Sequence, residues 1–405
     1  MQEGPLRRSI SLPALTFYSL GTMVGAGFYA LLGEVAAIAG PLTPWAFLAA
    51  CVTALFAVLT YAEFVTRYPR SGGIAIYAQR AFRGNRIGAI VGWAAMATGI
   101  VSAAALTHAF AGYLGEFVRL PDWLVFIAFT FVLGGLAAWG ISQSVAIAVT
   151  ITVIEVAGLL LVASVVLVSG DWQGVEPVEL LPSLSAFDAG AILIGGFLSL
   201  YAFIGFEDLV NVAEEAHRPE YAMPRALVYS LIVTALLYVG VSLVAVLAVS
   251  MPELQGSEAP LADVVRGRGA GWATLIGLIG LLAGINGALV QIIMASRVLY
   301  GMAREDMGPS WFDSVHPKTR TPVRATILVM LIVLVLALAF EIVTLAGITS
   351  FIILLLFAVL HIGLLRLKRR APRSEGALVL PAWVQWTGLV TIAVLLLARG
   401  ASLFN

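Results

Sequence analysis

The chain has 405 residues, of which 60% are hydrophobic and only 11% are charged, and its formal net charge is zero. A typical soluble domain is about 45–50% apolar and about 25% charged, so this composition indicates a polytopic protein embedded in a lipid bilayer. The balanced charge excludes a basic face for phosphates, and we therefore expect no nucleic-acid partner.

A transmembrane helix needs about 20 mainly apolar residues. The sequence contains eleven such segments, which predict an all-α polytopic fold of about eleven transmembrane helices in one domain, residues 1–405. The segments are 11–38, 43–66, 87–117, 122–139, 143–169, 186–211, 224–250, 271–302, 323–340, 342–365 and 377–398.

Basic residues lie mainly in alternate connections between these segments, which together hold 18 of the 23 lysines and arginines. Loops rich in Lys and Arg stay on the cytoplasmic side, so we expect a cytoplasmic amino terminus. The odd number of segments then places the carboxyl terminus outside the cell. We expect no cleavable leader before the first segment.

The first segment contains the run "GTMVGAGFYALLG" (21–33), and at 28 residues it is too long for one straight span. Glycine tolerates unwound backbone, and the half-helix that restarts after such a break presents free N–H groups and a positive dipole end to an anion. The preceding half-helix, near Met23, presents carbonyl groups that suit an ammonium. These features together predict a site for an α-amino acid. Glycines in membrane helices also serve close packing, which is the alternative for a lone break.

A second break, "FIGFED", interrupts the sixth segment at Gly205. Five segments start before residue 186 and five start in the following interval, so the second half is expected to be inverted relative to the first. We predict a first repeat over 11–169, a second over 186–365, and a last helix, 377–398, outside both. Matching breaks in inverted halves are typical of a transporter's binding site.

These motifs resemble the amino acid–polyamine–organocation (APC) transporter superfamily. The similarity includes both breaks, "YAEFVTRYPRSGGIAIYAQRAF" after the second segment, and "SRVLYGMAREDMGP" with "TPVRA" after the eighth, and it covers about residues 11–367. The resemblance implies the leucine-transporter-type 5+5 inverted-repeat fold and amino acid transport by alternating access at the cell membrane. Many members have twelve helices, whereas this chain has eleven predicted ones.

The resemblance also implies specific site residues. Amides around Gly25, Ala26 and Gly27 are expected to bind the substrate carboxylate, Tyr201 to cover the substrate, and Gln291 to face its side chain. The carbonyl groups expected to bind the amino group belong to Met23, Tyr201, Ala202 and Ile204.

Other polar residues lie within the predicted spans. Glu63, one turn from Arg67, is interpreted as half of a structural ion pair, with a gating role as the alternative. Glu207 at the second break is expected to bind freed backbone N–H groups or a proton, and His108 to be a packed, neutral histidine. The sequence shows no metal cluster, phosphate loop or nucleophile with a base, so we expect no enzyme activity, cofactor, metal or catalytic residue.

Glu155 lies near the middle of segment 143–169, where an ionised acid costs about 2.5–3.5 kcal/mol by insertion scales. Proton-coupled relatives commonly have a lysine at the corresponding position, so this chain has an acidic side chain where they have a basic one. A protonated Glu155 could donate a hydrogen bond to carbonyls of 21–24 or meet Asn286. We predict that Glu155 couples transport to protons. The alternatives are a sodium ligand and a permanently protonated structural residue.

The sequence therefore predicts a proton-coupled secondary transporter for an amino acid. A neutral substrate is expected for two reasons. The run "GWAAMATGIVSAAAL" (92–106) lacks the glutamate that members specific for basic amino acids often carry, and the expected pocket shows no acid that clearly faces the substrate side chain. The alternatives are an amino acid/polyamine exchanger or a sodium-coupled symporter, and, in other classes, a passive channel or a non-transporting sensor.

Overall fold

The computed structural model describes residues 10–69, 73–140, 145–183, 185–304, 308–371 and 377–403. In these ranges the chain is all-α, and an isolated bridge between Ile10 and Ala216 is the one β-type pairing. The predicted all-α polytopic fold is confirmed. The element bounds are α1 Leu12–Met23, α2 Ala26–Ala39, α3 Thr43–Arg67, α4 Gly73–Phe82, α5 Asn85–Gly115, α6 Asp122–Trp139, α7 Val145–Ser169, α8 Ala186–Phe203, α9 Pro219–Ala248, α10 Met251–Gln255, α11 Pro260–Val265, α12 Trp272–Arg304, α13 Val323–Ala339, α14 Ile342–Arg370 and α15 Trp383–Ala401.

Nine helical stretches of the described residues are long and apolar enough to cross a membrane. One of them, Ala26–Arg67, contains both α2 and α3, which a short 3-10 turn at Gly40–Leu42 separates. The helix Val323–Ala339 is apolar but slightly shorter. When Ala26–Arg67 is counted as two helices and Val323–Ala339 is added, the nine stretches become eleven, which correspond to the eleven predicted segments.

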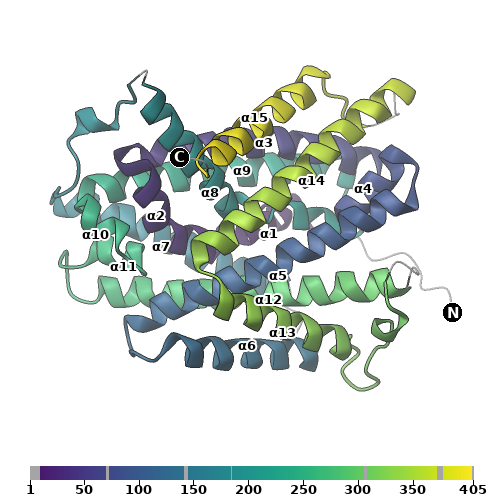
Figure 1. The fold of residues 1–405 in the computed structure, drawn as a ribbon, viewed down its shortest axis with the longest axis horizontal. Helices are drawn as coiled ribbons and strands as arrows, with labels where there is room; N and C mark the ends of the chain where they lie inside the picture. The colour runs from purple at the N-terminus through teal and green to yellow at the C-terminus, as the bar shows by residue number, and fades with distance from the viewer. Residues whose placement is uncertain are drawn as a thin grey trace.

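Both predicted breaks are present. Helix α1 ends at Met23 and α2 begins at Ala26, and α8 ends at Phe203 and is followed by a 3-10 helix, η3, over Phe206–Glu215. Around them the long helices run side by side as a bundle (Figure 1). Helix α1 packs on α7 and α9, α2 packs on α8, and α5 packs along α12, so the breaks are enclosed by protein.

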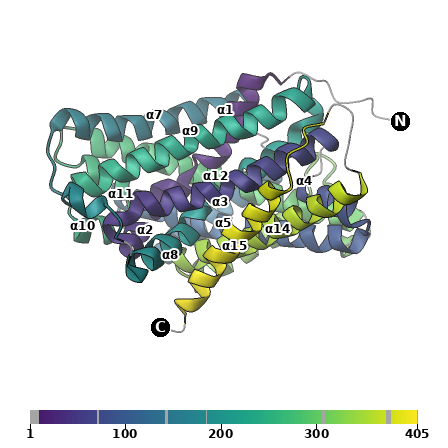
Figure 2. The same cartoon turned by 90° about the horizontal axis from the view of Figure 1, so that it is seen from above.

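Short helices cover the two ends of the bundle. Helix α4 lies at the end where the described chain starts, and α10 and α11 lie at the opposite end (Figure 2). Helix α15 packs on α3, α8 and α14. The sequence analysis did not predict α4, α10 or α11, because each is shorter than the window that identifies a span. The inverted repeats stay a prediction.

Candidate functional site

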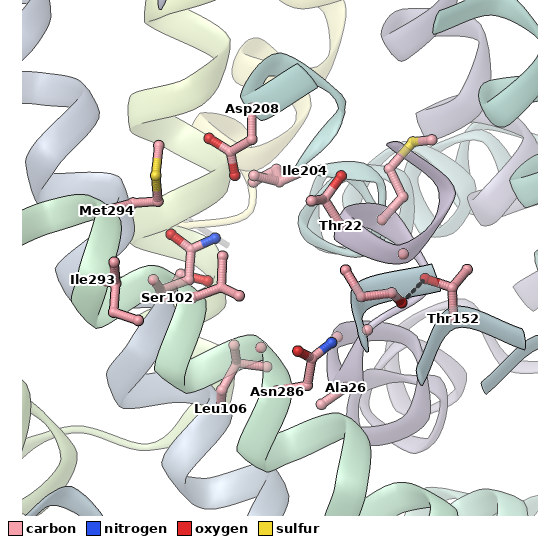
Figure 3. A pocket seen from close by; sticks show the side chains of 18 of the residues that line it. Thr22, Ala26, Ser102, Leu106, Thr152, Ile204, Asp208, Asn286, Ile293 and Met294 are labelled. Carbon is pink, nitrogen blue, oxygen red and sulfur yellow. Dashed lines mark hydrogen bonds between the residues drawn. The ribbon is translucent and has the colours of Figure 1, made fainter. Parts of the chain in front are cut away.

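A cavity of about 160 Å³ lies where the two breaks meet (Figure 3). Its walls come from α1, α2, α5, α7, α8, η3 and α12. All eight predicted substrate-binding residues line it, and so does Asn286. The residues that line the cavity include Met23, Gly25, Ala26, Gly27, Ser102, Leu106, Thr152, Tyr201, Ala202, Ile204, Asp208, Asn286, Val290, Gln291, Ile293, Met294 and Arg297.

The first break forms an anion receptor from backbone alone. Gly25 caps α2 in an extended conformation, with φ −75° and ψ −168°. Because α2 begins at Ala26, the N–H groups of Ala26 and Gly27 lie in the first helical turn and have no partner within the helix. A Cβ added to Gly25 would have no atom within 4 Å, so this backbone faces open space. Free N–H groups at a helix start, next to a cavity, suit a carboxylate.

Tyr201 packs against the start of α2. Its hydroxyl oxygen lies 2.9 Å from Ser102 Oγ, and the hydroxyl group donates to the Ser102 carbonyl at 3.1 Å. These contacts with α5 hold the Tyr201 ring in place. A Cβ added to Gly27 would lie 3.1 Å from the ring atom Cε1. A side chain at position 27 would therefore press on the Tyr201 ring, which favours glycine where α2 approaches α8.

The second break contacts the first. Gly205 has φ +127°, a conformation that L side chains rarely adopt, and a Cβ there would collide with the Thr22 carbonyl of α1. The Gly205 N–H donates to Glu207 Oε2 at 2.9 Å. This contact fits the backbone-binding role considered for Glu207, and the proton-binding role stays a prediction.

Tyr238 of α9 joins the two breaks, and the sequence analysis missed it. Its hydroxyl donates to the Met23 carbonyl at 2.6 Å and approaches the Ala202 carbonyl at 3.2 Å. The ring stacks on Phe28 with 4.2 Å between centroids, and the whole residue is buried. Each carbonyl has two lone pairs, so both can accept a further hydrogen bond from the cavity side.

Glu155 is fully buried on α7, one turn beyond Thr152, which lines the cavity. Its backbone carbonyl accepts a hydrogen bond from the Tyr29 hydroxyl at 2.7 Å. Within the described part of the chain, no hydrogen bond joins the Glu155 carboxyl group to the carbonyls of 21–24, so this predicted contact is absent. The predicted proximity to Asn286 is present.

Asp208 of η3 directs its carboxylate toward the cavity, on the side of Ile204 and Met294 (Figure 3). The sequence analysis noted this acid in "FIGFED" but did not assign it to the site. The structure thus adds an acid to the cavity wall that the sequence analysis did not assign to it. Gln291, predicted to face that side chain, lines the same wall.

The other polar residues have structural partners. Glu63 Oε1 accepts from Arg67 at 2.8 Å, as predicted, and its Oε2 lies 2.8 Å from Lys368 Nζ of α14. His108 Nε2 lies 3.0 Å from the Ala337 carbonyl, which fits the predicted packed histidine. Within the described ranges, no group of three or more His, Cys, Asp or Glu side chains is placed to hold a metal ion.

Comparison with known proteins shows the family to which the chain belongs. The profile described as "Amino acid permease" matches residues 10–403. The branched-chain amino acid permease BcaP of Bacillus subtilis is 27% identical over 80% of this chain and 73% of its own. Cationic amino acid transporter 4 of Mus musculus is 30% identical over 94% of this chain, which spans 63% of that relative's length. An uncharacterised transporter of Mycobacterium tuberculosis is 30% identical over 89% of this chain and 81% of its own. The chain belongs to the amino acid permease family, whose members are membrane transporters rather than enzymes.

Proposed function

We propose that this protein is a secondary transporter that moves an α-amino acid across the cell membrane by alternating access. The cavity at the two breaks carries the proposal. It offers free N–H groups at the start of α2 for a carboxylate, and the Met23 and Ala202 carbonyls, at the ends of α1 and α8, for an ammonium. These are the two charged groups that every α-amino acid shares, and they are matched by backbone dipoles rather than by charged side chains.

The cavity wall also bears on the substrate's side chain. Leu106, Val290 and Ile293 form an apolar surface that fits the neutral side chain predicted from the sequence. The similarity to a branched-chain permease supports the same class. The Asp208 carboxylate adds a counter-ion that a neutral side chain would not use.

Proton coupling is proposed to depend on Glu155. A carboxyl group that is fully buried at the centre of a span, without a cation, is most stable when protonated. Asn286 connects it to the substrate cavity, because this residue both approaches Glu155 and lines the cavity. Loss of the proton would place an uncompensated charge between α7 and α12 and would favour their separation.

Uptake of labelled leucine into liposomes containing the purified protein tests the proposed function. A transporter gives saturable uptake that excess unlabelled leucine blocks. A channel gives uptake that does not saturate, and a sensor binds leucine without uptake, so either result would reject the proposal. Uptake that requires sodium would reject the proton as the coupling ion.

A further inference from the structure

A second, larger cavity adjoins the amino acid site. Its volume is about 390 Å³, and it extends among α3, α4, α5, η3, α12 and α14. It lies toward the end of the bundle that α4 covers, which the distribution of basic residues assigns to the cytoplasm. Five residues belong to the walls of both cavities: Ser102, Ile204, Asp208, Gln291 and Met294. The two cavities therefore adjoin at a wall that includes Gln291, the residue expected to face the substrate side chain.

The described wall of the second cavity contains two acids and no basic side chain. Glu207 and Asp208 line it, whereas no lysine, arginine or histidine does. Arg297 lines only the first cavity, and none of the ion pairs formed among the described residues includes Glu207, Asp208 or Arg297. Glu207 accepts the Gly205 N–H, but neither acid has a cationic partner among the described residues. Carboxylates at membrane depth are costly without a counter-charge, so this wall favours a positively charged occupant.

A hydroxyl group in the same wall lacks a hydrogen-bond partner among the described residues. The Tyr61 side chain of α3 is fully buried, and its hydroxyl makes no hydrogen bond within the described part of the protein. Tyr61 lines the second cavity and lies near both carboxylates. The Asn211 side chain of η3 lines the same cavity. A buried hydroxyl without a partner is unfavourable, and an occupant that hydrogen-bonds to it would remove this cost.

We infer that the second cavity is a subsite for a primary ammonium group at the end of the substrate's side chain, held by Asp208 and Glu207 with Tyr61 as an additional hydrogen-bond partner. The inference rests on the proposed function, because the α-carboxylate and α-ammonium must first be held at the breaks. It extends the substrate class from neutral amino acids to those with a side-chain ammonium, such as lysine and ornithine. An ammonium has three donors, which match two carboxylates and one hydroxyl.

Binding of lysine and norleucine to the purified protein tests this subsite, because the two side chains have the same carbon skeleton and differ in the terminal ammonium. Each competes with labelled leucine. We expect lysine to bind at least tenfold more tightly than norleucine. Asp208→Asn should remove most of this difference, because it should weaken lysine binding much more than norleucine binding. Asp313→Asn, an exposed acid that lines neither cavity, is the matched control and should change neither.

The outcomes separate this inference from the proposed function. Equal binding of lysine and norleucine to the wild-type protein would overturn the subsite even if the Asp208 variant did not fold. An equal loss of both ligands in Asp208→Asn would assign the carboxylate to the α-ammonium and would overturn the side-chain subsite. If leucine itself did not bind, the proposed function would fail, and the subsite with it.

Discussion

At the scale of single residues, we expect substrate binding to depend on the absence of a side chain at Gly27. In Gly27→Val, the added Cβ would press on the Tyr201 ring, 3.1 Å from Cε1, beside the N–H groups at the start of α2. We expect the variant to lose leucine binding. Gly135→Val is the control, because Gly135 is exposed on α6 with no atom near its Cβ position, and it should bind normally. Normal leucine binding by a folded Gly27→Val protein would contradict the site.

Tyr238 is expected to position the ammonium site. Tyr238→Phe removes the hydroxyl that donates to the Met23 carbonyl and approaches that of Ala202. A hydrogen bond contributes about 0.5–1.5 kcal/mol, so we expect leucine affinity to fall by about two- to tenfold. Tyr113→Phe is the control, because that buried hydroxyl donates to the Tyr29 carbonyl within α2. A melting temperature lowered equally in both variants, with leucine affinity unchanged, would show that Tyr238 is only structural.

The sequence predicted the residues of the site that lie at the breaks, and it missed those that other elements bring to them. Gly25 and Gly205 are evident because glycine inside an apolar span requires an explanation. Tyr238 is one of several tyrosines in apolar runs, and nothing in its own segment indicates which carbonyl its hydroxyl reaches. Asp208 is part of the motif "FIGFED" at the second break, but the direction of its side chain depends on η3, a 3-10 helix that hydropathy does not predict.

At the scale of the helices, Glu63 connects α3 to both α14 and the segment before α15. Its carboxylate binds Arg67 and Lys368 and accepts the Leu380 N–H at 3.0 Å. Removing one partner of a buried ion pair costs about 3–5 kcal/mol, because the other charges stay uncompensated. Glu63→Gln should therefore lower the melting temperature clearly. Glu116→Gln, which breaks a partly exposed pair with Arg266, should cost less than about 1 kcal/mol. Similar melting temperatures for the two variants would show that Glu63 is not a structural anchor.

The helices themselves were predictable where they are long. Each predicted segment corresponds to a helix or to a broken pair, because a span must supply all its own backbone hydrogen bonds and therefore leaves a long apolar signal. The helix α4 was not predictable in this way. It is only ten residues long, with polar and apolar residues interspersed, and it is positioned by packing on α5 and α14.

At the scale of the whole molecule, Glu155 is proposed to link substrate transport to the proton. In sodium-free liposomes, leucine uptake should rise as the external pH falls, because an inward proton gradient drives it. Glu155→Gln mimics the protonated carboxyl group and cannot release a proton, so uptake should become insensitive to pH or vanish, while leucine binding persists. A variant with the full pH response would exclude Glu155 from coupling.

The central claim is that backbone groups at two helix breaks hold the substrate, and a crystal structure of the protein with leucine in a lipid environment tests it most directly. We expect the leucine carboxylate within hydrogen-bond distance of the N–H groups of Gly25, Ala26 and Gly27. The ammonium should lie within the same distance of the Met23 and Ala202 carbonyls, with Tyr238 still bound behind them. Leucine bound away from both breaks, or held there only by side chains, would contradict the account.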